Sequence, residues 1–299
     1  MNIHSLLDDL TVYSSLAMLA KTRYFRDDHS SADMPAHLAA IELDVPPIVG
    51  VGLYEVRGRS LAGEVDPAFR VAQWRGPGHA TILYHHGTSE NPYDMSFRYI
   101  LPFRKVEIPA NLIVLRAPFN RSFRDFAASI ARLENYVAMM ATSARLVEEL
   151  VRRLHDQGAG PVVVSGTSLG GFIANLHHAH YGSADAYTPL LAGAAMDAVL
   201  LDTIYRKLVA IQDERSAHDL RRALNFEDAF SRADLTKSYP VLARHDRYID
   251  YERQARCYGG RSVRVLEKGH VTGALSTRFL RQHLLAAAGI STDGDPPMV

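Results

Sequence analysis

The stretch Pro161–Gly171 constrains the fold more than any other part of the chain. It begins with a run of valines that is typical of a buried strand. It then passes through the pattern Gly166-Thr-Ser168-Leu-Gly170 into the helix-like sequence Phe172–Tyr181. A sharp turn from strand to helix lifts a serine hydroxyl clear of the sheet edge, and glycines flank it because a side chain there would collide with neighbouring backbone. We therefore predict that Ser168 is a nucleophile; a glycine-rich turn without chemistry is the alternative.

Length and charge narrow the class of protein. The 299 residues suffice for one large α/β domain or two small ones, and 47% hydrophobic with 22% charged residues is ordinary for a globular chain with a sizeable core. The 33 Lys and Arg residues balance 33 Asp and Glu residues, so no net field favours nucleic acid or an anionic membrane. We expect no nucleic-acid partner.

The single cysteine, Cys257, excludes an internal disulfide and a Cys-rich metal site. The segment Met1–Arg26 has no basic region before its apolar residues, and Asp8 and Asp9 interrupt them, so it does not have the pattern of a signal peptide. No apolar stretch is long enough to span a membrane. These features predict a cytoplasmic protein without a transmembrane segment.

Short apolar runs alternate with helical periodicity after residue 47, which predicts a largely parallel sheet covered by helices on both faces. An antiparallel pair joined by a Gly- and Pro-marked turn is expected to open this sheet. The expected strands are Ile48–Val56, Phe69–Trp74, Thr81–Tyr84, Leu112–Leu115, Pro161–Val164, Ala194–Leu201, Val241–Ala243 and Val263–Leu266. The expected helices are Phe123–His155, Phe172–Tyr181, Ile204–Arg232 and Leu275–Ala287. The interval Phe119–Gly158 is long enough for two helices, or for one long helix after an ordered loop.

The chain is therefore divided into an N-terminal helical extension over residues 1–47, one α/β domain over 48–290 and a short tail over 291–299. Mixed-charge helical sequence over about 202–238 lies between two late strands, and it is either a lid over a pocket or an ordinary solvated helix pair.

Residues Leu6, Leu10, Tyr13, Leu16, Ala20 and Tyr24 recur at steps of three and four, as in an amphipathic helix. We expect this stripe to dock on its own domain. A membrane surface or a partner subunit is the alternative, and a homodimer stays open.

An activated serine needs a base within hydrogen-bond reach, and the base needs an acid to orient it. The sequence Val263–Val271 has the pattern of a strand that ends in Gly269-His270 before the last helical segment. A histidine just past a strand end lies over the same edge of the sheet as Ser168. His270 is therefore the predicted general base.

The acid is expected between the serine and the histidine in the chain. Asp246 follows the strand Val241–Ala243 and is the predicted acid, which would fix the tautomer of the imidazole. Asp202, after the preceding expected strand, is the alternative acid. Asp250 is expected to be a turn or helix-capping residue, and Asp197, inside its expected strand, is the weakest candidate.

A further strand ends in His85-His86-Gly87-Thr88. Acyl transfer builds a negative oxygen in its transition state, and two backbone N–H groups aimed at it are a major catalytic contribution. We expect those of Leu169 and Thr88 to provide them, with His86 and Gly87 as a supporting loop. His177 and His180 share a helix face, but no carboxylate or thiolate nearby completes a metal site, so no metal is predicted.

Taken in chain order, His86-Gly87, Gly166-Thr-Ser168-Leu-Gly170, Asp246 and Gly269-His270 resemble the α/β-hydrolase superfamily over about residues 48–288. The resemblance implies an eight-stranded, mostly parallel sheet and a serine triad that needs no metal or organic cofactor.

The predicted function is that of a serine hydrolase acting on a small carboxylic ester or thioester through an acyl-enzyme. Acyl transfer with the same triad, amide cleavage, and a ligand-binding or scaffold protein without turnover are the alternatives.

Overall fold

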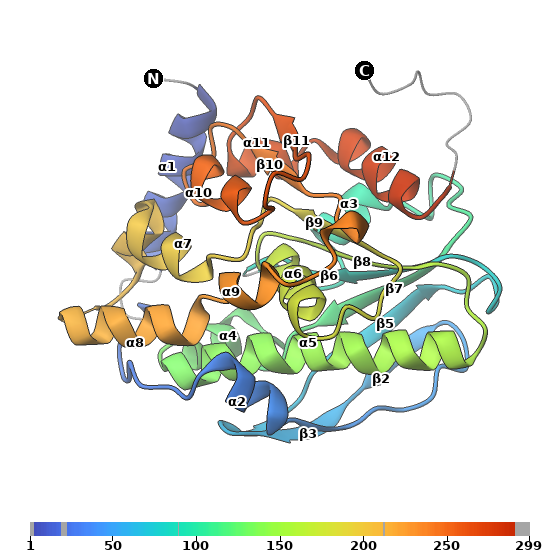
Figure 1. Ribbon diagram of the computed structural model, residues 1–299, viewed down its shortest axis with the longest axis horizontal. Helices are drawn as coiled ribbons and strands as arrows, with labels where there is room; N and C mark the ends of the chain where they lie inside the picture. The colour runs from blue at the N-terminus through green and yellow to red at the C-terminus, as the bar shows by residue number, and fades with distance from the viewer. Residues whose placement is uncertain (1–2, 19–22, 89, 212, 291–299) are drawn as a thin grey trace.

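The computed structural model describes residues 3–18, 23–88, 90–211 and 213–290, and only the backbone over 14–18. Among these residues, eight strands form one sheet in the order β11-β10-β9-β8-β6-β7-β5-β2 (Figure 1). The strands from β11 to β7 in this order are parallel, β5 is antiparallel to β7, and β2 is antiparallel to β5. The strands are β2 (Gly52–Glu55), β5 (Ala68–Gln73), β6 (Thr81–His85), β7 (Asn111–Arg116), β8 (Val162–Thr167), β9 (Ala186–Leu190), β10 (Val241–Ala243) and β11 (Arg264–Leu266). This arrangement confirms the predicted mostly parallel sheet of eight strands.

Helices cover both faces of this sheet, as predicted. In chain order the helices are α1 (Ile3–Met18), α2 (Met34–Ala39), α3 (Ser96–Ile100), α4 (Phe123–Ser129), α5 (Leu133–Asp156), α6 (Leu169–His180), α7 (Met196–Asp202), α8 (Glu214–Leu224), α9 (Glu227–Phe230), α10 (Tyr251–Arg256), α11 (His270–Ala274) and α12 (Thr277–Ala287). Two 3₁₀ turns, η1 (Ile204–Leu208) and η2 (Leu235–Lys237), complete the set in the described residues.

Side chains of each central strand alternate between two apolar clusters because successive residues of a strand point to opposite faces. Ile82 and Tyr84 of β6 pack in the cluster beneath α3 and α12. Leu83, between them, packs in the other cluster beneath α5 and α6. This two-sided burial explains why the strands are apolar throughout, and it leaves only the strand ends free for polar chemistry.

A separate three-stranded antiparallel sheet, β1-β3-β4, stands beside the main sheet. It consists of β1 (Glu42–Asp44), β3 (Arg57–Ser60) and β4 (Gly63–Val65). The antiparallel pairing of β2 with β5 agrees with the sequence prediction, but a whole hairpin, β3-β4, lies between them where only a turn was expected. The short strands of this hairpin are half polar, so their periodicity was too weak to separate from a loop.

The strand predicted over Ala194–Leu201 is wrong. Residues Met196–Asp202 form α7. The strand that lies between β8 and β10 in the sheet is β9, which begins eight residues before the predicted strand. Proline cannot donate to a sheet ladder, and Pro189 lies inside β9 opposite Gly166, so the apolar run after it was the more strand-like sequence. Asp197 and Asp202 therefore belong to a helix and not to a strand or its end.

Helix α1 packs on the domain with a face other than the predicted one. Leu6, Leu10 and Tyr13 are exposed, whereas Asp8 and Val12 are fully buried. The docking contact is thus partly polar, which an analysis of apolar periodicity misses. Of the other predicted members of that stripe, Tyr24 is buried but lies beyond the end of α1, and the side chain of Leu16 and all of Ala20 lie outside the described residues. Residues 291–299, predicted to be a tail, also lie outside them.

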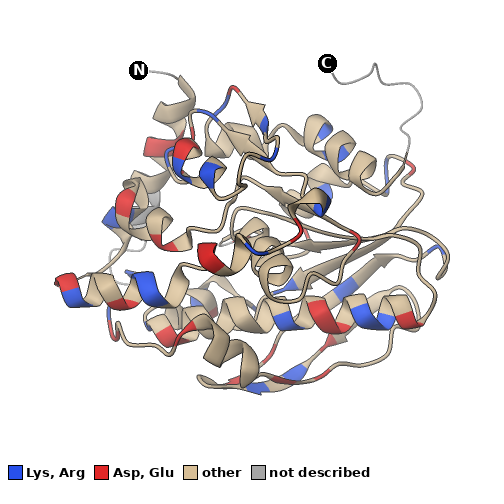
Figure 2. Ribbon diagram, viewed as in Figure 1, with Lys and Arg blue, Asp and Glu red and all other residues tan. Residues whose placement is uncertain are grey.

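Both signs of charge are distributed over the helices, and Figure 2 shows Lys and Arg interspersed with Asp and Glu along α5 and α8. This distribution agrees with the balanced composition of the chain. Among the helices in the described part of the chain, none combines the length and the apolar composition needed to cross a membrane.

Candidate active site

Ser168 stands at the turn between β8 and α6, with a φ of 55° and a ψ of −116°. A positive φ is uncommon for a residue with a side chain, and such a conformation costs about 1–3 kcal/mol. Two backbone hydrogen bonds hold it: Ser168 N–H donates to the carbonyl oxygen of Leu190 (2.9 Å), and its own carbonyl oxygen accepts from Phe172 N–H (3.0 Å). The strand is therefore followed by a strained residue that is half-buried and lines a cavity.

Close backbone contacts explain why glycine flanks this turn. A Cβ at Gly166 would lie 2.6 Å from the carbonyl oxygen of His85, and a Cβ at Gly170 would overlap that same oxygen. Strand β6 and the start of α6 thus approach each other more closely than any side chain permits. The two glycines are required by packing around Ser168.

Asp246 and His270, predicted from separate loops, are in direct contact. Oδ2 of Asp246 lies 2.7 Å from Nδ1 of His270, and both side chains are almost fully buried. Oδ1 of Asp246 accepts hydrogen bonds from the backbone N–H groups of Tyr248 and Ile249, each at 2.8 Å. The carboxylate is therefore fixed on both oxygens. It selects the imidazole tautomer with the proton on Nδ1 and leaves Nε2 as an acceptor.

Three carboxylates set the protonation of His270. Burial opposes a charge on the ring, but Asp246, followed by Asp8 and Glu90, outweighs burial and raises the pKa of His270 above its ordinary value. The aromatic ring of Tyr248 packs against the imidazole with 4.7 Å between ring centroids. The ring of His270 thus contacts Asp246 and Tyr248, and the charges of Asp8 and Glu90 add to that of Asp246.

A narrow cavity of about 10 Å³ adjoins Ser168. Thr88 and Leu169, the two predicted oxyanion residues, line it together with Ser168. Tyr248 and Ile249, which follow Asp246, line it as well. Among the described residues, the hydroxyl of Ser168 makes no hydrogen bond to His270. The structure therefore brings the two groups to one end of the sheet without joining them.

His85 and His86 hold the loop after β6 in place. Nε2 of His86 accepts from the backbone N–H of Ala117 (3.1 Å), so its Nδ1 must carry the proton that is donated to the carbonyl oxygen of Gly87 (2.7 Å). Burial lowers the pKa of His86 to about 4, and it also lowers the pKa of His85 well below its ordinary value. Both rings are neutral hydrogen-bonding groups that shape the backbone beside Thr88.

Glu90 is a charged group in this loop that the sequence analysis did not single out. Its Oε2 accepts hydrogen bonds from the hydroxyl (2.6 Å) and the backbone N–H (3.1 Å) of Ser96. A Cβ on Gly87 would lie 2.7 Å from its Oε1. Burial raises the pKa of Glu90, against the lowering effect of the hydrogen bonds from Ser96. A glutamate in a polar loop carries no sequence signal that separates it from a surface residue.

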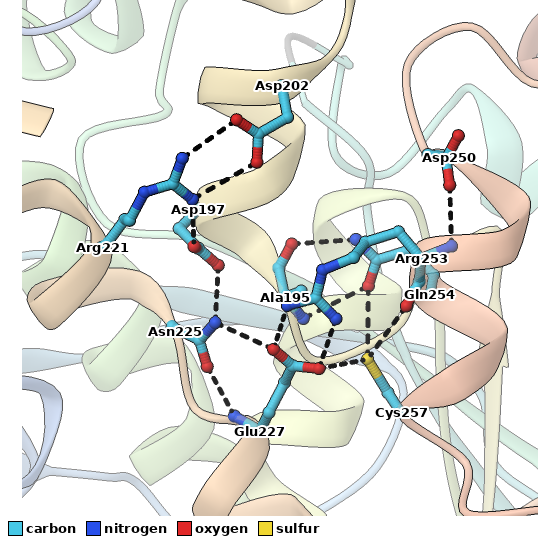
Figure 3. A network of polar contacts seen from close by, with 10 residues as sticks. All are labelled: Ala195, Asp197, Asp202, Arg221, Asn225, Glu227, Asp250, Arg253, Gln254 and Cys257. Carbon is cyan, nitrogen blue, oxygen red and sulfur yellow. Dashed lines mark hydrogen bonds and ion pairs between the residues drawn. The ribbon is translucent and has the colours of Figure 1, made fainter.

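The alternative acid, Asp202, is engaged elsewhere. Its carboxylate pairs with Arg221 of α8 at 3.0 Å, and Arg221 also reaches Asp197 at 3.2 Å. Figure 3 shows Arg221 in contact with both carboxylates, Asp197 in the first turn of α7 and Asp202 at its last residue. This network fastens the segment over 202–238 to the domain, and the His270 ring takes its carboxylate from Asp246.

The same network continues toward α10. Glu227 accepts from the side chain of Asn225 (2.9 Å) and pairs with the guanidinium of Arg253, and that hydrogen bond lowers the pKa of Glu227 to about 2. Asp250 caps α10 by accepting from Arg253 N–H (2.7 Å), which confirms the predicted capping role (Figure 3).

A much larger, open groove of about 1200 Å³ lies between the β1-β3-β4 sheet and α4. Arginines and carboxylates of both sides line it, and the three predicted triad residues do not. Size alone is therefore a poor guide to the site, because an open groove excludes little water.

No carboxylate lies near His177 in the sequence, but in the structure Glu148 of α5 lies 3.2 Å from its Nε2. The two residues lie on different helices, α5 and α6, so no local sequence pattern predicts this contact. In the described part of the chain, no group of three or more His, Cys, Asp or Glu residues is arranged to hold a metal ion.

No protein-family model matches the sequence, and no curated protein matches it either. Solved structures do match the fold at low identity. Acetyl xylan esterase 1 from Thermoanaerobacterium sp. JW/SL YS485 is 13% identical, with a TM-score of 0.51 over 89% of this chain and 98% of that chain. The acetyl xylan esterase from Paenibacillus sp. R4 is 10% identical, with a TM-score of 0.51 over 91% and 93%.

The acylaminoacyl peptidase of Pyrococcus horikoshii is also 13% identical and reaches a TM-score of 0.54, over 83% of this chain but only 44% of that longer chain. At such identities the likeness is one of fold. The chain has the α/β-hydrolase fold, as the sequence resemblance implied.

Proposed function

We propose that this protein is a serine hydrolase that cleaves a small carboxylic ester through an acyl-enzyme. The observation that carries the proposal is the contact between Asp246 and His270 at the end of the sheet where Ser168 stands in a strained turn. A buried carboxylate on Nδ1 is the arrangement that prepares Nε2 of an imidazole to accept a proton. Strain at a single serine is costly, and strained residues cluster where a side chain has chemistry to perform.

In this mechanism Ser168 Oγ attacks the acyl carbon while His270 Nε2 takes its proton. Asp246 stabilises the imidazolium that forms and does not itself become protonated. His270 then returns the proton to the leaving alkoxide, and the same ring activates the water that hydrolyses the acyl-enzyme.

The oxyanion would be held by backbone N–H groups of Leu169 and Thr88. Leu169 is the first residue of α6, and the first N–H groups of a helix have no partner within it. Its N–H is therefore free to donate toward the cavity, with the positive end of the helix dipole behind it. Removing one donor of this kind typically costs about 10²–10³ in kcat.

The walls of the cavity favour a compact acyl group. Large side chains line it together with Ser168: Tyr136, Phe172, Leu200 and Tyr205 of η1. Its volume is only about 10 Å³, far below the roughly 300 to 1000 Å³ of small-molecule sites, so the space beside Ser168 is tight. We therefore expect acetyl and propionyl esters to be better substrates than long-chain esters.

A fluorophosphonate probe tests the nucleophile directly. The wild-type chain should gain the mass of one phosphonyl group, and Ser168→Ala should gain none. A matched control is Ser165→Ala, because Ser165 is a buried serine of the same strand, bonded to the carbonyl oxygen of Thr188. Labelling that survives in Ser168→Ala, or a wild-type chain that is not labelled, contradicts the proposal.

Substrate class is tested by hydrolysis of p-nitrophenyl acetate, butyrate and octanoate, and of acetyl-coenzyme A as a thioester. The proposal expects kcat/KM to fall as the acyl chain lengthens beyond the cavity. A preference for octanoate would show that the cavity beside Ser168 does not hold the acyl group.

A further inference from the structure

Helix α1, from the start of the chain, reaches the two loops that carry the predicted base and acid. Asp8 is the centre of this contact. Its side chain is fully buried, and the shortest hydrogen bond of its carboxylate is to the backbone N–H of His270, which is 262 residues away in sequence. A buried carboxylate is expensive unless it is fully hydrogen-bonded, so its partners indicate what it is placed to hold.

The carboxylate of Asp8 accepts three backbone N–H groups. Oδ2 accepts from His270 (2.7 Å) and from Arg247 (3.1 Å), and Oδ1 accepts from Val271 (3.0 Å). Two of these donors begin α11, whose first N–H groups have no partner within the helix. The third, Arg247, directly follows Asp246. One side chain thus bridges the loop of the predicted base and the loop of the predicted acid.

Further contacts from α1 surround this bridge. The backbone carbonyl oxygen of Asp8 accepts a hydrogen bond from the hydroxyl of Tyr248 (3.1 Å). The ring of the same tyrosine packs on His270. Ser5 donates to the carbonyl oxygen of His245 (3.2 Å), and the ring of His4 contacts the hydroxyl of Thr272 (3.0 Å). The first turns of α1 therefore fix both loops and not one alone.

Gly269 gives an independent sign that this contact is built into the fold. A Cβ at this position would lie 2.7 Å from Oδ2 of Asp8 and 2.8 Å from the backbone oxygen of His4. Any other residue before His270 would push α1 away. The sequence Gly269-His270 is thus matched to the presence of the helix.

From this geometry we infer that Asp8 is a positioning residue that sets the distance and orientation between His270 and Asp246, so that the site is complete only with α1 docked. The inference rests on the proposed function for its catalytic meaning. Asp8 acts through the two loops and touches neither substrate nor the imidazole ring nitrogens in its hydrogen bonds.

Asp8→Asn in the full chain is the decisive variant. It keeps the size of the side chain and one acceptor oxygen, but it directs an amide group at a backbone N–H and removes a negative charge. Misplacing a catalytic group by about 1 Å can cost about 10²-fold, so we expect kcat with p-nitrophenyl acetate to fall about ten- to a hundredfold with KM little changed. Asp9→Asn is the control, because Asp9 is the next residue and pairs with the exposed side chain of Arg247.

A second readout separates positioning from general stability. The groups that face His270 are Asp8 of α1, Asp246 after β10, Glu90 after β6 and the ring of Tyr248. Loss of the Asp8 charge should lower the pKa of His270, so the acid limb of the kcat/KM profile should move to lower pH. Titration of the His270 ring by NMR, assigned with His270→Gln, should show the same shift without any substrate.

The outcomes are distinct. A folded Asp8→Asn chain that keeps kcat within about twofold and an unmoved His270 titration overturns the inference. A wild-type chain that is inactive and unlabelled at Ser168 overturns the proposed function, and the NMR titration of Asp8→Asn still decides whether Asp8 controls His270. If Asp8→Asn fails to fold, Ser5→Ala with His4→Ala, which removes two contacts beside Asp8 and leaves Asp8 in place, should lower kcat by a smaller factor; unchanged kcat overturns the inference.

Discussion

Replacing Asp246 by asparagine tests the predicted triad most sharply, because the structure dictates how the amide must sit. Oδ1 of Asp246 accepts two backbone N–H groups at 2.8 Å, and a side-chain NH₂ placed there would lose both hydrogen bonds. Each is worth about 1 kcal/mol, and each orphaned donor costs about 1–3 kcal/mol more. The amide oxygen of the substituted side chain must therefore keep that side, and its NH₂ must face Nδ1 of His270.

The consequence is a change of tautomer. Nδ1 has to accept the amide proton, so the imidazole carries its own proton on Nε2 and cannot take one from Ser168. A serine triad with the wrong tautomer loses about 10⁴ in kcat, which is about 5.5 kcal/mol of transition-state stabilisation. The fold should survive, since the backbone hydrogen bonds are kept.

Asp202→Asn is the matched control, because it removes the same charge from the alternative acid. Asp202 is about half exposed and pairs with a half-exposed Arg221, and ion pairs of this kind contribute about 0–1 kcal/mol. We expect kcat for p-nitrophenyl acetate to stay within about twofold, with thermal melts confirming that both variants fold. An Asp246→Asn enzyme within tenfold of wild type, or an Asp202→Asn enzyme that loses as much as predicted for Asp246→Asn, would refute the assignment.

Three further predictions concern the turn, the base and the ion-pair network. Gly170→Ala should lower the free energy of unfolding in urea by about 1–3 kcal/mol or more, because the new Cβ overlaps a backbone oxygen. Gly78→Ala, with open space around it, should change this free energy by no more than about 0.5 kcal/mol, and equal effects of the two substitutions would contradict the packing argument. The base must be neutral to act and the pKa of His270 is raised, so kcat/KM measured between about pH 5 and pH 9 should decline on the acid side with an apparent pKa above 6.5; a limb below that value would contradict the raised pKa of His270. The hydrogen bond from Arg253 lowers the pKa of Glu227 from 4.5 to about 2, so the charged Glu227 stabilises the fold above pH 4.5 and this stabilisation is lost as pH falls toward 2. The difference in unfolding free energy between wild type and Glu227→Gln should therefore shrink from about pH 6 to pH 3. A constant difference would show that the charge contributes nothing.

Local patterns were sufficient for much of the sheet. The strands β6, β7, β8 and β10 overlap the apolar runs that were predicted to be strands. They were recognisable because buried strands are continuously apolar and end at glycine, proline or polar residues. The failure at β9 has the opposite cause. Its proline makes it look unlike a strand, and only pairing with β8 and β10 on either side makes an extended conformation favourable there.

The choice of acid shows where local patterns stop. Asp246 and Asp202 each followed an expected strand, so both satisfied the same rule in the sequence. Arg221, from a helix 19 residues beyond Asp202, contacts one of them, and the His270 ring contacts the other. Neither contact has a signature that the sequence alone can show.

The sequence by itself determined the strand–turn–helix at Ser168, the order of the predicted site residues and the two-sided cover of the sheet. Each of these depends on residues within a few positions of one another, where glycine, β-branched residues and helical spacing act directly on the backbone. Only the tertiary structure decided the partner of Asp202, the exposure of the apolar stripe on α1 and the bridge that Asp8 makes to His270 and Arg247. Those contacts join residues up to 262 positions apart, and their energy comes from burial and hydrogen bonding that exist only once the chain has folded.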